Sequence, residues 1–133
     1  MRVVLDTNIL VSALLSPFGP PARVLDMVLN GELRAAYDDR LLAEYRELLA
    51  RERFGFAPED VAAVLAYLET EGEWVMVQPL VCELPDPDDL PFLEVVAQTE
   101  AALITGNSAH YPEIARGKVQ VMTPGAFIRA WRS

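Results

Sequence analysis

The apolar positions of this chain alternate between two patterns, a short continuous run and a helical period. Val3-Val4-Leu5 is the first continuous run, and such a run is typical of a strand buried on both faces of a parallel sheet. Further short strands are expected at residues 33–37, 74–77, 101–105 and 119–122. The chain therefore predicts a sheet of four to five strands.

Between these strands, apolar residues recur every three or four positions, as in helices that bury one face. Helices are expected at about residues 9–15, 20–29, 40–52, 58–71 and 123–131, with another that carries Phe92, Leu93, Val96 and Ala97 on its apolar face. Strands that alternate with helices favour parallel pairing and cover on both faces of the sheet. The predicted fold class is α/β, a three-layer α/β/α sandwich around a central, mainly parallel sheet.

The length of 133 residues suits one domain, here residues 1–133. No apolar run approaches the roughly 20 residues of a membrane span, and the amino terminus has no secretory pattern. The single cysteine, Cys82, has no partner for an internal disulfide, which suits a reducing compartment. We expect a cytoplasmic protein with no membrane association.

Polar residues follow the predicted strands at positions where open α/β sheets place their chemistry. Asp6 ends the first strand and Asn107 lies just past the fourth. On a helical wheel, Glu44 flanks the apolar stripe of its helix, and Asp89 lies over the face of Phe92 with Asp88 close behind it. These side chains can meet in one crevice.

Each acidic residue also has an ordinary structural interpretation. Asp6 suits a helix N-cap, Glu44 an ion pair with Arg40 or Arg51, and residues 86–89 a solvated loop. Carboxylates gathered in one crevice repel one another, however, and hard divalent cations resolve that conflict. Taken together, the positions favour a Mg²⁺ or Mn²⁺ site that activates water for phosphoryl displacement.

The net charge of −9, from 20 acidic and 11 basic residues, argues against broad binding to nucleic acid. Four arginines around the Glu44 helix can line a path for RNA or form surface ion pairs with Asp39, Glu47 and Glu52; they are Arg40, Arg46, Arg51 and Arg53. His110, the one histidine, invites interpretation as a general base or as a structural loop residue.

The chain resembles the PIN-domain ribonucleases, in particular the toxins of toxin–antitoxin systems related to VapC. The resemblance covers nearly the whole chain and is carried by four segments: Val3 to Ala13, Leu41 to Tyr45, Asp86 to Leu93, and Thr105-Gly106-Asn107. The first and third segments are specific in combination, whereas Thr-Gly-Asn alone is a weak motif. The resemblance implies a PIN-like domain with an α/β/α fold.

The resemblance also implies functional roles. Asp6, Glu44 and Asp89 would be acidic metal ligands and catalytic residues, and Asn107 falls where most family members carry a further Asp. Thr7, Asn8 and Ser12 would orient the first carboxylate, and Thr105 would support the site. The implied activity is hydrolysis of single-stranded RNA by metal-activated water, in a homodimeric toxin with an antitoxin partner. An uncharged Asn107 is expected to weaken a second metal ion more than the first.

Two other functions fit parts of the sequence. A catalytically silent PIN-like module that binds RNA or protein is favoured by Asn107 and by the acidity, and disfavoured by the intact Asp6, Glu44 and Asp89 set. A phosphatase with Asp6 as nucleophile would, in the haloacid-dehalogenase pattern, need a second Asp where Asn8 stands. Metal-dependent RNA cleavage distinguishes the nuclease from the silent module.

Overall fold

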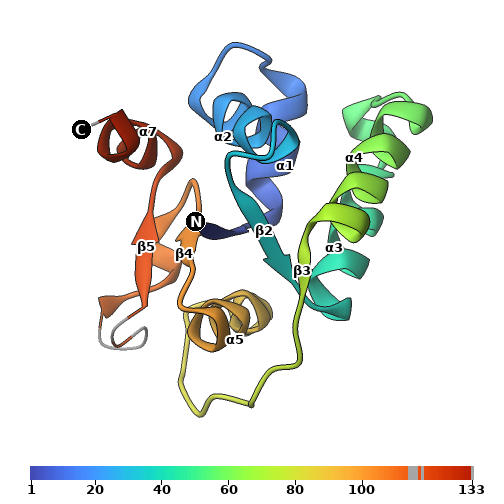
Figure 1. The fold of residues 1–133 in the computed structure, drawn as a ribbon. Helices are drawn as coiled ribbons and strands as arrows, with labels where there is room; N and C mark the ends of the chain where they lie inside the picture. Colours follow the sequence, from blue (N-terminus) through green and yellow to red (C-terminus); the bar gives the residue numbers. More distant parts are fainter. Residues whose placement is uncertain (114–116, 118, 133) are drawn as a thin grey trace.

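The computed structural model describes residues 1–113, 117 and 119–132, which form one parallel sheet and the helices around it (Figure 1). The strands are β1 (Arg2–Leu5), β2 (Arg34–Tyr37), β3 (Glu73–Trp74), β4 (Ala102–Ile104) and β5 (Gln120–Met122). They are ordered β3-β2-β1-β4-β5, and every pair is parallel. This sheet confirms the predicted α/β fold class.

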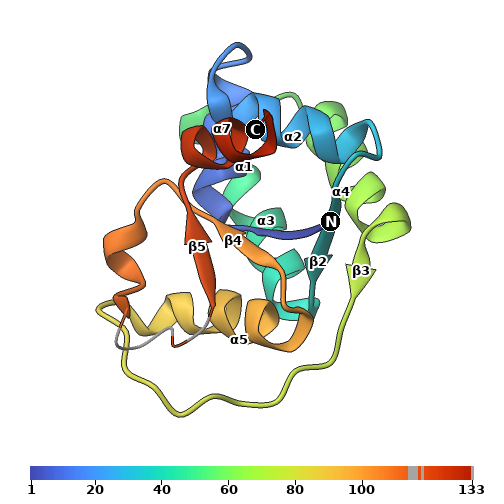
Figure 2. The same ribbon diagram turned by 60° about the vertical axis from the view of Figure 1, so that its left-hand side comes forward.

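Helices lie on both sides of the sheet. They are α1 (Thr7–Leu15), α2 (Pro20–Leu29), α3 (Asp39–Leu49), α4 (Pro58–Glu71), α5 (Leu90–Thr99) and α7 (Pro124–Arg132), with 3₁₀ turns η1 (Glu52–Phe54), η2 (Pro87–Asp89) and η3 (Ser108–His110). Helix α5 packs on β1, β2 and β4, and α1 and α2 lie on the opposite side of the sheet (Figure 2). Helix α7 packs against α2.

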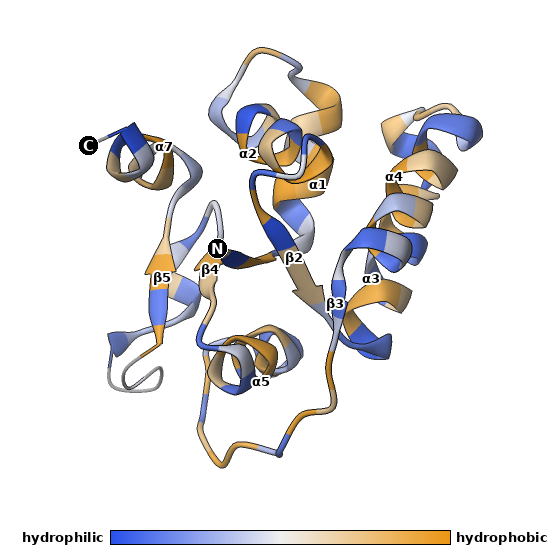
Figure 3. Cartoon of the chain, in the orientation of Figure 1, coloured by the Kyte–Doolittle hydropathy of each residue, from blue (hydrophilic) through white to orange (hydrophobic). Residues whose placement is uncertain are grey.

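The core forms around β1, as its apolar run predicts. Val3, Val4 and Leu5 are buried, because β1 has a strand on each side and helices over its faces. Helices α3 and α4 carry both apolar and polar residues (Figure 3). The buried residues of α3, which are Leu41, Tyr45 and Leu49, are four positions apart and so share one face. Among the residues that the structure describes, no helix has the length and apolar character needed to cross a membrane.

Two expected boundaries and one expected buried position differ in the structure. The helix expected to reach residue 52 ends at Leu49, and a 3₁₀ turn follows. The strand expected at 74–77 is only Glu73–Trp74, since β3 is an edge strand with a single neighbour. On α5, Ala97 is exposed and Val95 is buried instead.

The strand order changes direction at β1, and this determines where a site can form. From β1 the chain builds the sheet first toward β2 and β3 and later toward β4 and β5. Ligands of open α/β sheets bind beyond the carboxyl ends of the strands at such a switch point. Leu5 pairs with Ile104, so the next residues, Asp6 and Thr105, lie side by side at that edge.

A buried glutamate connects α5 to α3 and to the segment before η2. Glu94 is buried on α5, its Oε1 lies 2.7 Å from Nη1 of Arg40, and its Oε2 accepts a 2.8 Å hydrogen bond from the Leu80 N–H. Arg40 also pairs with Asp38, the N-cap residue of α3. This network holds the start of α3 against the helix that follows Asp89.

We predict that Arg40→Met lowers the free energy of unfolding by about 2 kcal/mol, because it leaves the Glu94 carboxylate buried without its cation. Arg46→Met is the matched control: Arg46 is on the same helix and pairs with Glu69 at 2.7 Å, but both partners are about half exposed. The control is expected to cost less than about 1 kcal/mol. Urea unfolding measures both values, and equal losses would contradict the assigned role of Glu94.

Candidate active site

Asp6 occupies the first position after β1, and its side chain lies at the carboxyl end of the neighbouring strand β4. The Thr105 hydroxyl donates a 2.8 Å hydrogen bond to Asp6 Oδ2, and the Tyr111 hydroxyl donates one of 3.3 Å to the same oxygen. Asp6 has the backbone position of an N-cap for α1, but its side chain makes no capping hydrogen bond. The hydroxyl groups of Thr105 and Tyr111 hold its carboxylate toward the end of β4, and the backbone N–H groups of Thr7 and Asn8 also act on it.

The contrast with Asp38 makes this orientation clear. Asp38 is the N-cap residue of α3, and its carboxylate accepts hydrogen bonds from the N–H groups of Arg40 and Leu41, both at 3.0 Å. Both aspartates are buried. Burial raises the pKa of Asp6, while the hydroxyl groups of Thr105 and Tyr111, and after them the backbone N–H groups of Thr7 and Asn8, lower it.

Glu44 reaches the same edge from α3. Its carboxylate accepts a hydrogen bond from the Thr7 hydroxyl, and the Tyr45 hydroxyl donates one of 2.5 Å to the Leu5 carbonyl, which fixes α3 against β1. Burial, and next the negative charges of Asp6 and Asp88, raise the pKa of Glu44 against the effect of the Thr7 hydrogen bond. The Thr7 hydroxyl thus binds Glu44, while the Thr7 backbone N–H acts on Asp6.

Asp89 brings a third carboxylate, at the end of η2. Its Oδ2 atom is buried and accepts no hydrogen bond from any residue that the structure describes, although Nδ1 of His110 lies 3.1 Å away. Burial and the charges of Asp6 and Asp86 raise the pKa of Asp89 to about 6, and His110 acts in the opposite direction. Asp89 therefore shares an electrostatic environment with Asp6.

Asp88, the neighbouring candidate, has a different environment. Its side chain is exposed, and its N–H donates a 3.0 Å hydrogen bond to Asp86 Oδ1, which caps the turn. Its charge acts on Glu44. The geometry therefore favours Asp89 over Asp88 as the carboxylate turned toward Asp6.

The remaining candidates lie beside these carboxylates. The Asn107 N–H donates a 3.2 Å hydrogen bond to Thr105 Oγ1, and its side chain is exposed. Asn107 lines a cavity of about 400 Å³ together with Asn8 and Ser12. The structure thus brings Asp6, Glu44, Asp89 and Thr105 to one edge, and gathers these three uncharged side chains in an adjoining hollow.

The sequence analysis did not assign Tyr111 to the site and left the role of His110 open. Tyr111 is fully buried and contacts Asp6, while His110 contacts Asp89. A hydroxyl-bearing aromatic residue close after the fourth strand is a weak signal for such a contact. Its partner is 105 positions away, so periodicity could not reveal it.

The donor set suits a hard divalent cation. Asp6, Glu44 and Asp89 supply carboxylate oxygens, the ligands that Mg²⁺ and Mn²⁺ prefer, and the buried Asp89 Oδ2 lacks a hydrogen-bond donor within the described chain. Within that same part of the chain, no three His, Cys, Asp or Glu side chains are close enough to hold an ion directly. An ion at this edge would keep several waters, as Mg²⁺ commonly does.

The arginines near α3 are engaged in contacts of their own. Arg40 pairs with Asp38 and Glu94, Arg46 with Glu69 and Arg51 with Glu47, while the Arg53 guanidinium lies 4.8 Å from the centre of the Phe54 ring. The Arg51–Glu47 pair is one that the ion-pair interpretation expected. This interpretation is favoured over an RNA path lined by these arginines.

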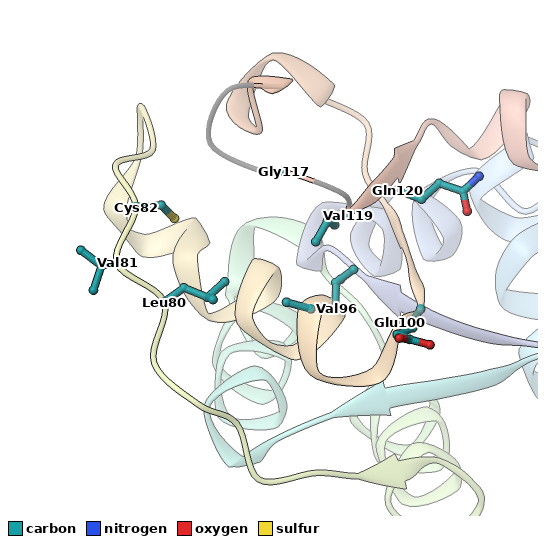
Figure 4. A pocket seen from close by; sticks show the side chains of 10 residues that line it. Leu80, Val81, Cys82, Val96, Glu100, Gly117, Val119 and Gln120 are labelled. Carbon is teal, nitrogen blue, oxygen red and sulfur yellow. The ribbon is translucent and has the colours of Figure 1, made fainter.

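A larger cavity, of about 630 Å³, lies away from the carboxylates, between α5, β5 and the segment before η2 (Figure 4). Leu80, Val96 and Val119 give it apolar walls, and Cys82 and Glu100 also line it. It gathers no carboxylate cluster. The acidic edge, and not this apolar cavity, has the chemistry of an active site.

The raised pKa of Asp89 predicts a pH dependence. A carboxyl group whose pKa is higher in the folded than in the unfolded protein favours folding below its unfolded pKa, and this contribution is lost as the pH rises through the folded value. With chelator present, we expect wild-type stability, relative to Asp89→Asn, to fall by on the order of 2 kcal/mol between pH 4 and pH 7. Urea unfolding at both pH values measures the difference, and a constant or rising difference would contradict it.

Comparison with known proteins agrees with this fold. Residues 2–109 match the family model described as PIN domain. The uncharacterized protein MJ1680 of Methanocaldococcus jannaschii is 27% identical over 143 residues, which cover 96% of this chain and 90% of that protein.

Two solved structures share the fold at low identity. VapBC-1 from nontypeable Haemophilus influenzae is 17% identical with a TM-score of 0.61, covering 94% of this chain and 99% of that one. VapBC2 from Rickettsia felis, bound to a DNA fragment from its promoter, is 16% identical with a TM-score of 0.59. The match covers 92% of this chain and 98% of that one. Because the family model spans most of the sequence, the chain belongs to the PIN domain family, nucleases that generally use divalent metals.

Proposed function

We propose that this protein is a metal-dependent endoribonuclease that hydrolyses single-stranded RNA, and that residues 1–133 form its one PIN domain. The observation that carries the proposal is the convergence of Asp6, Glu44 and Asp89 at the carboxyl edge of β1 and β4. Each carboxyl has a raised pKa, caused first by burial. The negative charge of Asp6 further raises the pKa values of Glu44 and Asp89.

The three carboxylates would hold Mg²⁺ or Mn²⁺. When bound, such an ion supplies an activated water and neutralises charge that develops on the phosphodiester. Thr105 and Tyr111 hold Asp6 by hydrogen bonds, and Thr7 holds Glu44. These hydroxyls orient the two carboxylates and oppose the effect of burial, because each donates a hydrogen bond that favours the charged form.

Asn107 is proposed as a fourth ligand through its amide oxygen. It brings no charge, so the site would hold one ion more tightly than a second. Asn107 is exposed, and its backbone is fixed to Thr105, which keeps it beside Asp6.

The proposed partners follow from the resemblance to toxins related to VapC. The similar solved structures carry the names VapBC-1 and VapBC2, the second bound to promoter DNA. We propose that this chain is the cytoplasmic toxin of a toxin–antitoxin pair, that it forms a homodimer and that an antitoxin protein binds it.

A catalytically silent module that binds RNA or protein is the second candidate. Two observations favour it: the uncharged Asn107 at the site, and the net charge of −9, which suits a basic protein partner.

Cleavage of a mixed single-stranded RNA pool by purified protein, with Mg²⁺, Mn²⁺ or EDTA, tests the nuclease. We expect cutting that needs the metal and that falls more than about a hundredfold in Asp6→Asn. Asp60→Asn is the matched control, because Asp60 is exposed on α4, and its activity should equal that of the wild type. RNA binding without cutting under any metal would favour the silent module.

Asn107→Asp tests whether the missing charge limits the site. We expect the Mg²⁺ concentration for half-maximal cleavage to fall roughly tenfold, because an added carboxylate strengthens cation binding. Asn107→Ala should raise it. A Mg²⁺ dependence that is the same in all three proteins would remove Asn107 from the ligand set.

A further inference from the structure

The hollow beside the carboxylates is lined mostly by residues that the proposed metal chemistry does not use, with Asn107 shared between the two. Its polar side chains are Asn8, Ser12 and Asn107, which come from α1 and from the turn after β4. The side-chain hydrogen bonds that hold Asp6 come instead from Thr105 and Tyr111. The two amides and the hydroxyl therefore offer donors and acceptors to the hollow itself.

The other walls are apolar and rigid. Ile9 is buried beneath the hollow's edge, and Pro20, Pro21 and Pro124 line it from the first turns of α2 and α7. Proline has no N–H group, so these three residues present ring carbons and no backbone donors to the hollow. The walls suit the faces of a flat, uncharged ring.

Two glycines, Gly106 and Gly125, line the hollow. An added Cβ on Gly106 would find only Asn8 Oδ1 within 4 Å, at 3.8 Å, outside its immediate chain neighbours. An added Cβ on Gly125 would meet Nη1 of Arg129 at 3.4 Å. The volume of about 400 Å³ lies within the range of small-molecule sites, in which apolar walls bury a ligand and a few polar groups orient it.

The hollow lies directly beside the carboxylates. Asn107 and Gly106 follow Thr105, whose hydroxyl binds Asp6, and Asn8 is two residues after Asp6. A phosphodiester at the carboxylates would thus carry its neighbouring nucleotide over the hollow. None of the lining residues is charged, so the hollow suits the base of that nucleotide and not its phosphate.

We propose that this hollow, lined by Asn8, Ser12 and Asn107, binds one nucleobase next to the scissile phosphate and selects it by hydrogen bonds to its edge. Unpaired bases of single-stranded RNA are recognised in this way, by packing of the ring and by hydrogen bonds to its edges. The proposal rests on the proposed ribonuclease function and gives it a base preference.

The test is the sequence of the cut ends from a randomised single-stranded RNA pool, with wild type, Asn8→Leu and Ser12→Ala. Wild type should prefer one base at a fixed position beside the cut. Each variant should lower that preference by about three- to tenfold, because one hydrogen bond to the base is lost. Gln98→Met, an exposed amide on α5, is the matched control and should keep the wild-type preference.

The outcomes separate this proposal from the function on which it rests. Metal-dependent cutting without a base preference, or with a preference that both variants retain, would overturn the base site and leave the nuclease intact. An equal loss of rate on all sequences would also overturn it, since that is the effect of a residue that orients Asp6. Absence of cutting by the wild type would refute the ribonuclease and the base site together.

Affinity provides a second measurement that does not depend on turnover. The Asp6→Asn protein, in EDTA, should bind an oligonucleotide with the preferred base more tightly than one without it, and adding Asn8→Leu should remove the difference. Equal affinity for both oligonucleotides in the Asp6→Asn protein would contradict base recognition.

Discussion

The site depends on the parallel pairing of β1 with β4. Because Leu5 is in register with Ile104, Asp6 and Thr105 emerge side by side, and the Thr105 hydroxyl can bind Asp6 Oδ2 at 2.8 Å. The same pairing lies at the switch point of the sheet, where the elements before β4 and those after it diverge. A shift in register by one residue would turn Asp6 to the other face of the sheet. The fold thus sets the position of its central carboxylate through backbone hydrogen bonds that join residues about 100 positions apart.

The cost of the arrangement is electrostatic. Asp6, Glu44 and Asp89 are at least partly buried, and their pKa values are raised, so each would be more stable uncharged or paired. Two other buried acids of the described chain are paired: Asp38 caps α3, and Glu94 binds Arg40 and the Leu80 N–H. The carboxylates at the edge receive hydroxyl hydrogen bonds from Thr7, Thr105 and Tyr111, and His110 lies beside Asp89. Within the described part of the chain, these acids have no ion pair with lysine or arginine, which is the character of a site built for an external cation.

Local patterns in the sequence were enough to predict the elements that carry the site. The apolar run before Asp6 and the helical periods around Glu44 and Phe92 are each contained within a few turns of chain, so they locate β1, α3 and α5. The length of β3, the end of α3 and the burial of Val95 depend on neighbouring elements, and no local period records them. The contacts of Tyr111 with Asp6 and of Arg40 with Glu94 join residues 105 and 54 positions apart, which explains why neither was predicted. The choice between Asp88 and Asp89 required the geometry of η2, because a helix start is uncertain by a few residues in a sequence.

Calorimetric titration of Mn²⁺ into metal-free protein tests the central claim most directly, namely that these three carboxylates form a cation site. The account predicts saturable binding by the wild type, loss of that binding in Asp6→Asn and in Asp89→Asn, and retention in Asp60→Asn, in which the altered residue is on the surface of α4. Absence of saturable binding by the folded wild-type protein, or equal binding by all four proteins, would contradict it.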